Sequence, residues 1–384
     1  MVARRAERRD GARRAHPRFR SHLWLPYLVA HYVAATGDRS VLDVERAYIE
    51  GPAVPPQLEG ITLAPRPTPE TASIYEHCRR AIERSLAARG ANGLPLLGTG
   101  DWNDGLDELG FGGRGESTWM AFFLHRVLRD FAPLAAERGE EAVAARYRVE
   151  ADAIAAACHR MERGAGYVRA TSDDGAEFTI DSGLMTSWPA LSGAVDHPRA
   201  ALVMRNGLAA LEQERMIRML VPSFDEHSRP YPGRIALYPP GVRENGGQYS
   251  HGVSWIVDAA TVLAREATQA DEAAEWRATA ARVWTKISPL GKTEEPGVLG
   301  RYELPPHQQA ADIYYGAGYT LRGGWPAYTG AAARMLWAAY GMFGITLSTG
   351  EFSISHEAFQ PRGDITLAAV TWHGRRHVAP SAGV

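Results

Sequence analysis

Five carboxylates, one tryptophan and seven glycines lie within the stretch Gly98–Ser117, between two segments whose patterns indicate helices. Glycine at this density lets a backbone approach a ligand closely, and catalytic groups are often carried on loops between rigid elements. A carboxylic acid among tryptophans and glycines is typical of sugar chemistry, where the acid protonates the leaving oxygen. By composition alone, a solvated acidic turn is an equally good interpretation.

Two further stretches place polar side chains and glycines directly before a predicted helix. Tyr238–His251 gathers an arginine, a glutamate, an asparagine and a histidine around a Gly-Gly turn, and Arg322–Gly330 ends in Tyr-Thr-Gly. Helix N-termini present unpaired N–H groups and a positive dipole end, so Thr329 and Gly330 could hold an oxyanion. Together with His251 and an arginine they predict a phosphate site. Taken singly, Thr329 is better explained as an N-cap, and His251 is better explained as a hydrogen-bonded structural histidine.

Other kinds of site have little support in the sequence. It contains no His-Glu-x-x-His and no paired Cys-x-x-Cys, which argues against a zinc site. It contains no Gly-x-Ser-x-Gly, which argues against a serine hydrolase. No Gly-rich dinucleotide loop follows a strand pattern. We therefore expect no metal and no cofactor.

The composition of the chain limits the kinds of partner and the compartment that we expect. A formal net charge of −2 on 384 residues gives no reason to expect nucleic acid. No run of 18 apolar residues exists, so we expect no membrane span. The basic start holds eight arginines up to Arg20 but no apolar core of a secretory signal. Cys78 and Cys158 are the only cysteines, which fits a reducing compartment and predicts a cytoplasmic protein.

Apolar residues recur at helical spacing in nine segments, and these come in pairs joined by loops. The segments are Leu23–Val33, Ser73–Arg89, Ser117–Glu137, Glu141–Glu162, Ser182–Ser192, Pro198–Met216, Gly252–Ala267, Asp271–Ile287 and Thr329–Phe343. Gly164–Phe178 indicates a small β excursion, and the proline-rich passage Gly51–Pro69 indicates an irregular connection. The pattern predicts an all-α array of helical hairpins in one domain, with functional loops gathered at one end.

The three stretches together resemble glycoside hydrolase family 94, and within it the phosphorylase-like region of cyclic β-1,2-glucan synthases. The motifs are Gly-Thr-Gly-Asp-Trp-Asn-Asp-Gly with Gly-Arg-Gly-Glu-Ser (98–105 and 113–117), Tyr-Pro-Pro-Gly-Val-Arg-Glu-Asn-Gly-Gly-Gln-Tyr-Ser-His (238–251) and Gly-Gly-Trp-Pro-Ala-Tyr-Thr-Gly (323–330). The resemblance implies an (α/α)6 barrel, a six-hairpin toroid, over residues 23–345. It also implies a barrel incomplete at both ends, between a basic, poorly ordered start (1–22) and an atypical tail (346–384).

The activity that the resemblance implies is inverting phosphorolysis of β-linked glucosides, with β-1,2-glucan as the expected substrate and α-glucose 1-phosphate as the product. Inorganic phosphate is the co-substrate, so one protein carboxyl suffices as general acid. By the motif match that acid is Asp104, and the residues that match the family's phosphate-binding positions are His251, Thr329 and Gly330. The positions that match substrate contacts are Asp101, Trp102, Asn103, Tyr238, Arg243, Glu244 and Trp325.

The chain departs from the family pattern in places that leave alternatives open. The family places an Arg and an Asp pair before its Trp-Leu-Pro-Tyr helix, whereas Pro17–Leu23 holds no acidic residue. The family's Glu-Pro is replaced by Glu303-Leu304-Pro305. The alternatives are a catalytically impaired carbohydrate-binding remnant and an inverting glycoside hydrolase. Expected partners are a β-glucan or β-glucooligosaccharide and phosphate, with a homodimer or association with N-terminal regions. As part of a larger synthase, the chain would lie at the cytoplasmic face of the inner membrane.

Overall fold

The computed structural model describes residues 21–50, 66–348, 351–354, 369–372 and 375–378. Within these ranges, nine helices of ten or more residues match the nine predicted segments, so the predominantly helical prediction is confirmed. They are α2 (Trp24–Thr36), α3 (Ile74–Ala87), α4 (Thr118–Glu137), α5 (Glu141–Arg160), α6 (Gly183–Ser192), α7 (His197–Leu211), α8 (Ser250–Glu266), α9 (Ala270–Ile287) and α12 (Thr329–Met342). None of the helices in the described ranges is long and apolar enough to cross a bilayer.

One predicted helix end was wrong. Helix α7 ends at Leu211, five residues before the predicted end at Met216. The chain reverses there, because Gln213 donates its backbone N–H to the carbonyl of Met216 at 2.9 Å and Glu212 bridges to Ile217. A tight turn of this kind is incompatible with helical backbone.

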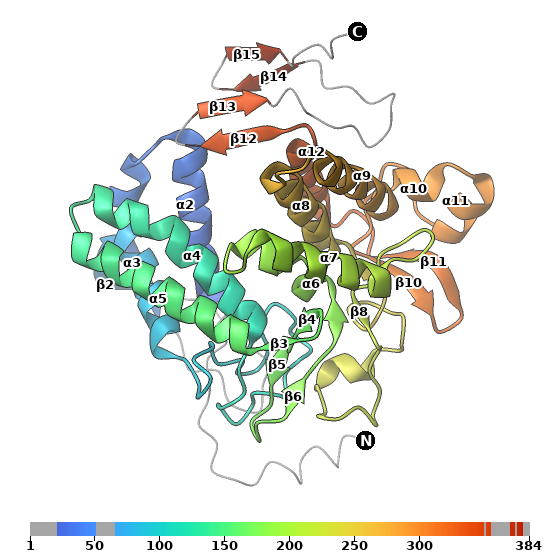
Figure 1. Ribbon diagram of the computed structural model, residues 1–384, viewed down its shortest axis with the longest axis horizontal. Helices are drawn as coiled ribbons and strands as arrows, with labels where there is room; N and C mark the ends of the chain where they lie inside the picture. The colour runs from blue at the N-terminus through green and yellow to red at the C-terminus, as the bar shows by residue number, and fades with distance from the viewer. Residues whose placement is uncertain (1–20, 51–65, 349–350, 355–368, 373–374, 379–384) are drawn as a thin grey trace.

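Three pairs of consecutive helices pack as hairpins, α4 with α5, α6 with α7 and α8 with α9 (Figure 1). The first helices of successive hairpins are neighbours, so α2 contacts α4, α4 contacts α6, α6 contacts α8, and α8 contacts α12. Tryptophans from three of these helices meet in the core. The rings of Trp119 and Trp188 are 5.7 Å apart and those of Trp188 and Trp255 are 5.2 Å apart. The core therefore lies among the first helices of the hairpins.

Short antiparallel strands lie between and after the helices. The sequence did not predict most of these strands. They are β1 (Glu45–Glu50), β2 (Arg66–Ser73), β3 (Glu162–Arg163), β4 (Gly166–Tyr167), β5 (Ala170–Thr171), β6 (Glu177–Phe178), β7 (Asp181–Ser182), β8 (Leu220–Val221), β9 (Gln248–Tyr249), β10 (Asp312–Gly316), β11 (Tyr319–Gly324), β12 (Ile345–Ser348), β13 (Glu351–Ile354), β14 (Ala369–Trp372) and β15 (Arg375–Val378). The predicted β excursion at Gly164–Phe178 is confirmed by β4 to β6. Residues 66–69, predicted as irregular, belong to β2. A two-stranded hairpin has only edge strands, where proline is tolerated.

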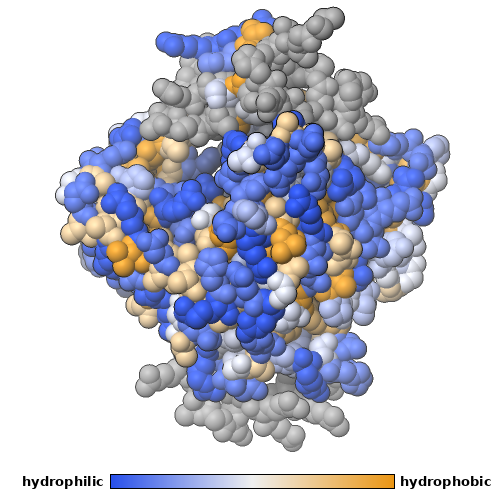
Figure 2. Space-filling model, in the orientation of Figure 1, coloured by the Kyte–Doolittle hydropathy of each residue, from blue (hydrophilic) through white to orange (hydrophobic). Residues whose placement is uncertain are grey.

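Residues 1–20 of the predicted basic start lie outside the described residues, whereas Ser21 and His22 are described. Within the predicted tail, β12 pairs with β13 and β14 pairs with β15 as two hairpins. Both β12 and β13 contact α2 (Figure 1). Polar residues cover most of the coloured surface in Figure 2, with apolar residues in small separate groups.

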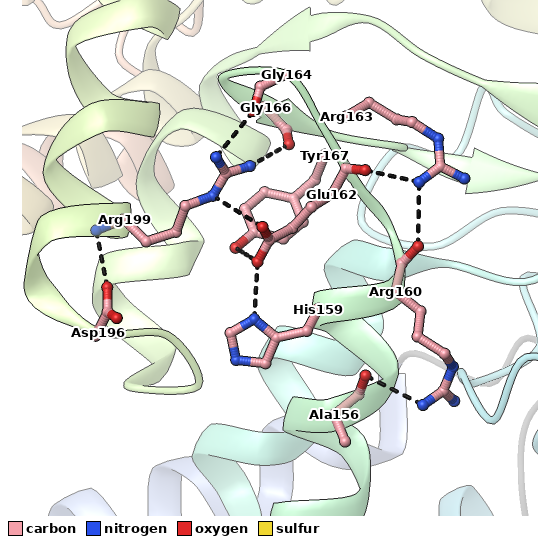
Figure 3. Close-up of polar contacts among 10 residues, drawn as sticks. All are labelled: Ala156, His159, Arg160, Glu162, Arg163, Gly164, Gly166, Tyr167, Asp196 and Arg199. Carbon is pink, nitrogen blue, oxygen red and sulfur yellow. Dashed lines mark hydrogen bonds and ion pairs between the residues drawn. The ribbon is translucent and has the colours of Figure 1, made fainter.

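The β3–β4 hairpin, which leads toward the site, is clamped to helix α7 by one arginine (Figure 3). Arg199 donates through Nη1 to the carbonyl of Gly164 and through Nη2 to that of Gly166, both at 2.8 Å. Its Nε lies 3.5 Å from a carboxylate oxygen of Glu162. Asp196, the N-cap of α7, accepts the Arg199 backbone N–H at 2.9 Å. The connection from α5 to α6 is thereby held at a fixed place on the helices.

Candidate active site

A buried ion pair fixes the start of the loop Gly98–Ser117. Asp101 is 0% exposed and Arg169 is 1% exposed. Arg169 donates Nη1 to Oδ2 of Asp101 at 2.6 Å and Nη2 to Oδ1 at 2.7 Å. Ser117 Oγ donates to Oδ2 at 2.6 Å, and the same hydroxyl accepts the Met120 N–H that begins α4. One set of contacts therefore joins the loop, helix α4 and the strand region after β4.

The protonation of Asp101 follows from these partners. Burial alone would raise the pKa of Asp101, but the charge of Arg169 and the hydrogen bonds from Arg169 and Ser117 outweigh it, so the pKa lies below its ordinary value. Since both oxygens of Asp101 bind protein donors, we assign this residue to shaping the loop; its predicted contact with substrate stays a prediction. Arg169 was missed by sequence reasoning. The only signal was an arginine among apolar residues, Tyr167-Val-Arg-Ala170.

The remaining carboxylates of the loop differ in how deeply they are buried. Glu116 is 1% exposed and accepts the backbone N–H groups of Asn92 and Leu94 at 3.1 and 3.0 Å. Asp107 accepts the Arg234 backbone N–H at 2.7 Å. Asp104 is exposed, while its backbone carbonyl accepts Arg234 Nη2 at 3.0 Å. The main chain at Asp104 is therefore fixed, and its side chain lies at the surface of the loop where a substrate can reach it.

Two neighbours of Asp104 complete this segment. Asn103 is 5% exposed and accepts the Gly105 N–H at 3.0 Å through its side-chain oxygen, so it closes the turn that carries Asp104. Trp102 extends in the other direction, to the second sequence stretch. Its ring centroid is 5.6 Å from Tyr249, 5.6 Å from His251 and 5.7 Å from Trp255.

The approach of Trp102 to helix α8 requires glycine at position 252. A Cβ there would lie 2.7 Å from Cη2 of Trp102 and 2.8 Å from the sulfur of Met219, closer than carbon atoms pack. The absence of a side chain thus lets the acid-bearing loop lie against the first turn of α8. The loop and the Tyr238–His251 stretch, predicted separately, are adjacent in the structure.

His251 is the second residue of α8. Its ring lies 5.1 Å from that of Trp255, one turn later on the same face. Burial, with the nearby charge of Arg334, lowers the pKa of His251 to about 4. No described residue hydrogen-bonds to its ring, so the alternative of a hydrogen-bonded structural histidine is not supported. At neutral pH this is an uncharged imidazole with a nitrogen available to a ligand.

A three-stranded sheet, β9-β10-β11, joins the second and third stretches. Asp312 in β10 is registered with Tyr249 in β9 on one side and with Gly324 in β11 on the other. The strand β9 leads into α8, and β11 is followed by Trp325 and then α12, so the sheet sets the two helix N-termini beside each other. Trp325 is 60% exposed.

Helix α12 begins at Thr329, with Tyr328 as its N-cap and no side-chain capping bond. The alternative that Thr329 serves as the N-cap is therefore wrong. Its hydroxyl lies at the first helical position, next to Gly330, where backbone N–H groups point out of the helix end. Because α8 and α12 pack together, both ends of the predicted phosphate site belong to neighbouring helices.

A charged cluster lies beside the sheet. The guanidinium carbon of Arg243 is 4.7 Å from the ring centroid of Tyr238 and 5.9 Å from that of Trp325. Its Nε lies 3.5 Å from Oε2 of Glu244. Four residues predicted to contact substrate, from two separate stretches, are therefore brought together.

Asp312 belongs to the same cluster and was missed by sequence reasoning. It is 1% exposed, and its Oδ1 has no hydrogen-bond partner among the described residues. Burial raises the pKa of Asp312 to about 6, with Arg243 lowering it and Glu244 raising it. A lone aspartate after two alanines in a buried strand was the signal available in the sequence. Arg243 Nε and Glu244 Oε2 form an ion pair but, like Oδ1 of Asp312, have no hydrogen-bond partner among the described residues. Such buried atoms suit the hydroxyl groups of a sugar.

Two of the solved structures that align with this chain share its general fold. A family 78 rhamnosidase of Bacillus sp. GL1 aligns with a TM-score of 0.52 and 13% identity, covering 84% of this chain and 26% of the rhamnosidase. A sialidase aligns with a TM-score of 0.53 and 11% identity, and the alignment covers 86% of this chain and 26% of the sialidase chain. At such identities the likeness concerns the fold. The chain is therefore a helical domain of the same general fold as these two proteins.

The chain belongs to the glycosyl hydrolase 94 superfamily, whose catalytic-domain model matches residues 4–343. It is 35% identical over 321 residues to the cyclic beta-(1,2)-glucan synthase NdvB of Rhizobium meliloti (strain 1021), covering 81% of this chain and 11% of the synthase. It is 28% identical over 252 residues to the solabiose phosphorylase of Paenibacillus borealis, covering 63% of this chain and 30% of the phosphorylase. The chain thus spans less than a third of each of these relatives.

Proposed function

We propose that this domain catalyses inverting phosphorolysis of β-linked glucosides, with inorganic phosphate as the second substrate, no cofactor, and α-glucose 1-phosphate as the product. The observation that supports the proposal is the approach of Trp102 to His251, which joins the loop that carries Asp104 to the first turn of α8. The succession of neighbouring first helices supports an (α/α)6 barrel as the scaffold. Membership of a family that includes phosphorylases supports the reaction type.

The mechanism requires one proton and one nucleophile. Asp104 gives its proton to the glycosidic oxygen, and the bond between that oxygen and C1 breaks. A phosphate oxygen, with the anion held by His251, Thr329 and Gly330, forms the new bond to C1 from the opposite face. The β configuration therefore becomes α. Phosphate takes the place that water has in an inverting hydrolase, so no second carboxylate is needed as base.

For the sugar, β-1,2-linked glucan is our proposal, supported by the 35% identity to the cyclic glucan synthase. Tyr238, Trp325 and the Arg243–Glu244 pair form the polar and aromatic surface on which the glucose units would bind. Aromatic faces bind the apolar faces of sugar rings, and charged groups take the hydroxyls.

The test is incubation of the chain with β-1,2-oligoglucans and inorganic phosphate, followed by assay of glucose 1-phosphate. We expect glucose 1-phosphate to appear only when phosphate is present, in the α configuration. Reducing sugar released at the same rate without phosphate would instead show an inverting hydrolase. Glucan binding without either product would show a binding remnant, the alternative that the lack of acidic residues in Pro17–Leu23 favours.

A further inference from the structure

Helices α8 and α12 face each other with matching polar residues. On α8, His251, Trp255 and Asp258 follow at spacings of four and three, which places them on one face. On α12, Gly330 and Arg334 are four residues apart and also share a face. The two helices pack together, and the pair of Arg334 with Asp258 joins these two faces.

Arg334 occupies the centre of this contact. It forms an ion pair with Asp258 through Nη2. Its guanidinium carbon lies 5.7 Å from the ring centroid of Trp255, and the ring of Trp255 lies 5.1 Å from that of His251. The Nε of Arg334 is buried without a hydrogen-bond partner among the described residues. Arg334 and His251 therefore both lie beside the ring of Trp255.

The position of Arg334 on α12 keeps it close to the helix end. It lies one turn after Gly330 on the same face, and its guanidinium contacts Asp258 and Trp255 of α8. A guanidinium has five N–H donors in a fixed fork. The ion pair with Asp258 fixes the orientation of this fork and leaves other donors for a second anion.

A phosphate anion at the predicted site needs a positively charged partner. Burial and the nearby Arg334 hold the pKa of His251 at about 4, so His251 gives a hydrogen bond but no charge at neutral pH. Backbone N–H groups and the Thr329 hydroxyl carry no full charge either. Phosphate near neutral pH has one to two negative charges, which are costly to desolvate without a cation. Arg334 is the arginine whose charge reaches His251 in this structure.

We propose that Arg334 is a phosphate-binding residue that supplies the permanent positive charge of this site, and that Asp258 positions its guanidinium. The inference deepens the proposed function, since it assigns the anion ligand of the same site. The competing interpretation is structural, with Arg334 and Asp258 only joining α12 to α8.

The test measures binding of inorganic phosphate alone, by calorimetry, to the wild-type chain and to Arg334→Met and Arg334→Lys. Charge-assisted hydrogen bonds contribute about 1.5–3 kcal/mol, so we expect Arg334→Met to weaken phosphate binding ~10–100-fold. Arg334→Lys keeps the charge and should recover part of the loss. Binding of a β-1,2-oligoglucan without phosphate should stay within about twofold of wild type, because no sugar contact is assigned to Arg334.

Arg205→Met is the matched control. Arg205 also lies over a tryptophan, 4.8 Å from the ring of Trp276, and pairs with Glu275 at 2.9 Å, but it joins α7 to α9 far from His251. We expect its phosphate affinity to equal that of wild type. A second readout is the NMR titration of His251, which should move to higher pH in Arg334→Met and stay unchanged in Arg205→Met.

Three outcomes would overturn the inference. They are wild-type phosphate affinity in a folded Arg334→Met chain, equal losses in Arg334→Met and Arg205→Met, or no phosphate binding by wild type. Should Arg334→Met fail to fold, Arg334→Lys and Asp258→Asn decide, since both should fold and weaken phosphate binding more than glucan binding. Phosphate binding that depends on Arg334 without release of glucose 1-phosphate would support this inference and contradict the proposed reaction.

Discussion

Asp101 and Asp104 are separated by two residues, yet their surroundings give them opposite roles. Asp101 is fully buried against Arg169, which keeps it ionised and bound to protein donors. Asp104 is exposed on a main chain fixed by Arg234. A general acid must reach its substrate and give up a proton, so the exposed Asp104 is our proposal for that role.

We therefore predict that Asp104→Asn lowers the rate of glucose 1-phosphate release by ~10²–10⁴, the usual contribution of general acid catalysis. Because Asp104 is exposed, the thermal midpoint should change little. Glu108→Gln on the same loop is the control and should keep most of the activity. Wild-type turnover by Asp104→Asn would show that another group carries the proton.

Asp312 predicts a pH dependence of sugar binding. Its pKa, raised to about 6 chiefly by burial, means that the carboxyl is anionic above about pH 6 and neutral below it. The anion accepts sugar hydroxyls and faces Arg243, so we expect the KM for glucan to rise as the pH falls through about 6. Asp312→Asn should have a high KM without this step.

The control for this pH profile is Glu303→Gln. Glu303 pairs with Arg322 at 2.9 Å in a solvent-exposed position, outside the cluster. Its removal should leave the transition near pH 6 in place. A transition that persists in Asp312→Asn would assign the ionisation to a different group.

At the scale of elements, the site depends on how closely loop and helix approach. We predict that Gly252→Ala impairs activity by displacing Trp102, since the added Cβ would meet its ring at 2.7 Å. Alanine is the better helix former by roughly 0.5–1 kcal/mol, so α8 itself should not be weakened. The expected readout is a lower kcat/KM with a shifted tryptophan emission spectrum.

Gly300→Ala is the matched control, because a Cβ on this helical glycine of α11 (Pro296–Tyr302) would meet nothing within 4 Å. It should leave both activity and emission unchanged. Unchanged activity in Gly252→Ala would mean that the loop tolerates a shift of Trp102.

The sequence predicted these helices because their apolar residues recur every three or four positions, as in α4. It did not predict β9, which has two residues and therefore no period to detect. The Asp101–Arg169 pair joins residues 68 positions apart, so only tertiary structure reveals it. Asp312 was missed for the same reason, since its partners Arg243 and Glu244 precede it by many residues. Local patterns thus predicted the scaffold and the three stretches, whereas contacts between stretches needed the structure.

At the scale of the whole molecule, apolar side chains are exposed on two helices that meet. His31 of α2 and Trp337 of α12 lie 4.7 Å apart, ring to ring. On the same two helices, Leu28 of α2 is 56% and Leu336 of α12 is 55% exposed. Exposed apolar groups that gather in one place favour association.

We predict that the chain self-associates through this surface and that the double variant Leu28→Glu, Leu336→Glu is more monomeric. Sedimentation velocity at several concentrations measures this. Leu202→Glu changes a leucine that is 46% exposed on α7, and it serves as the control. An unchanged distribution of species in the double variant would exclude this surface as the site of association.

The ion pair of Asp101 with Arg169 also has a consequence for folding during synthesis of the chain. A ribosome releases Asp101 well before Arg169, and in that interval the carboxylate has no guanidinium to meet. The loop that carries Asp104 can therefore take its working shape only after the β hairpin beyond α5 has emerged. We expect nascent chains that end before residue 169 to be inert toward sugar, even though the motif around Asp104 is already complete.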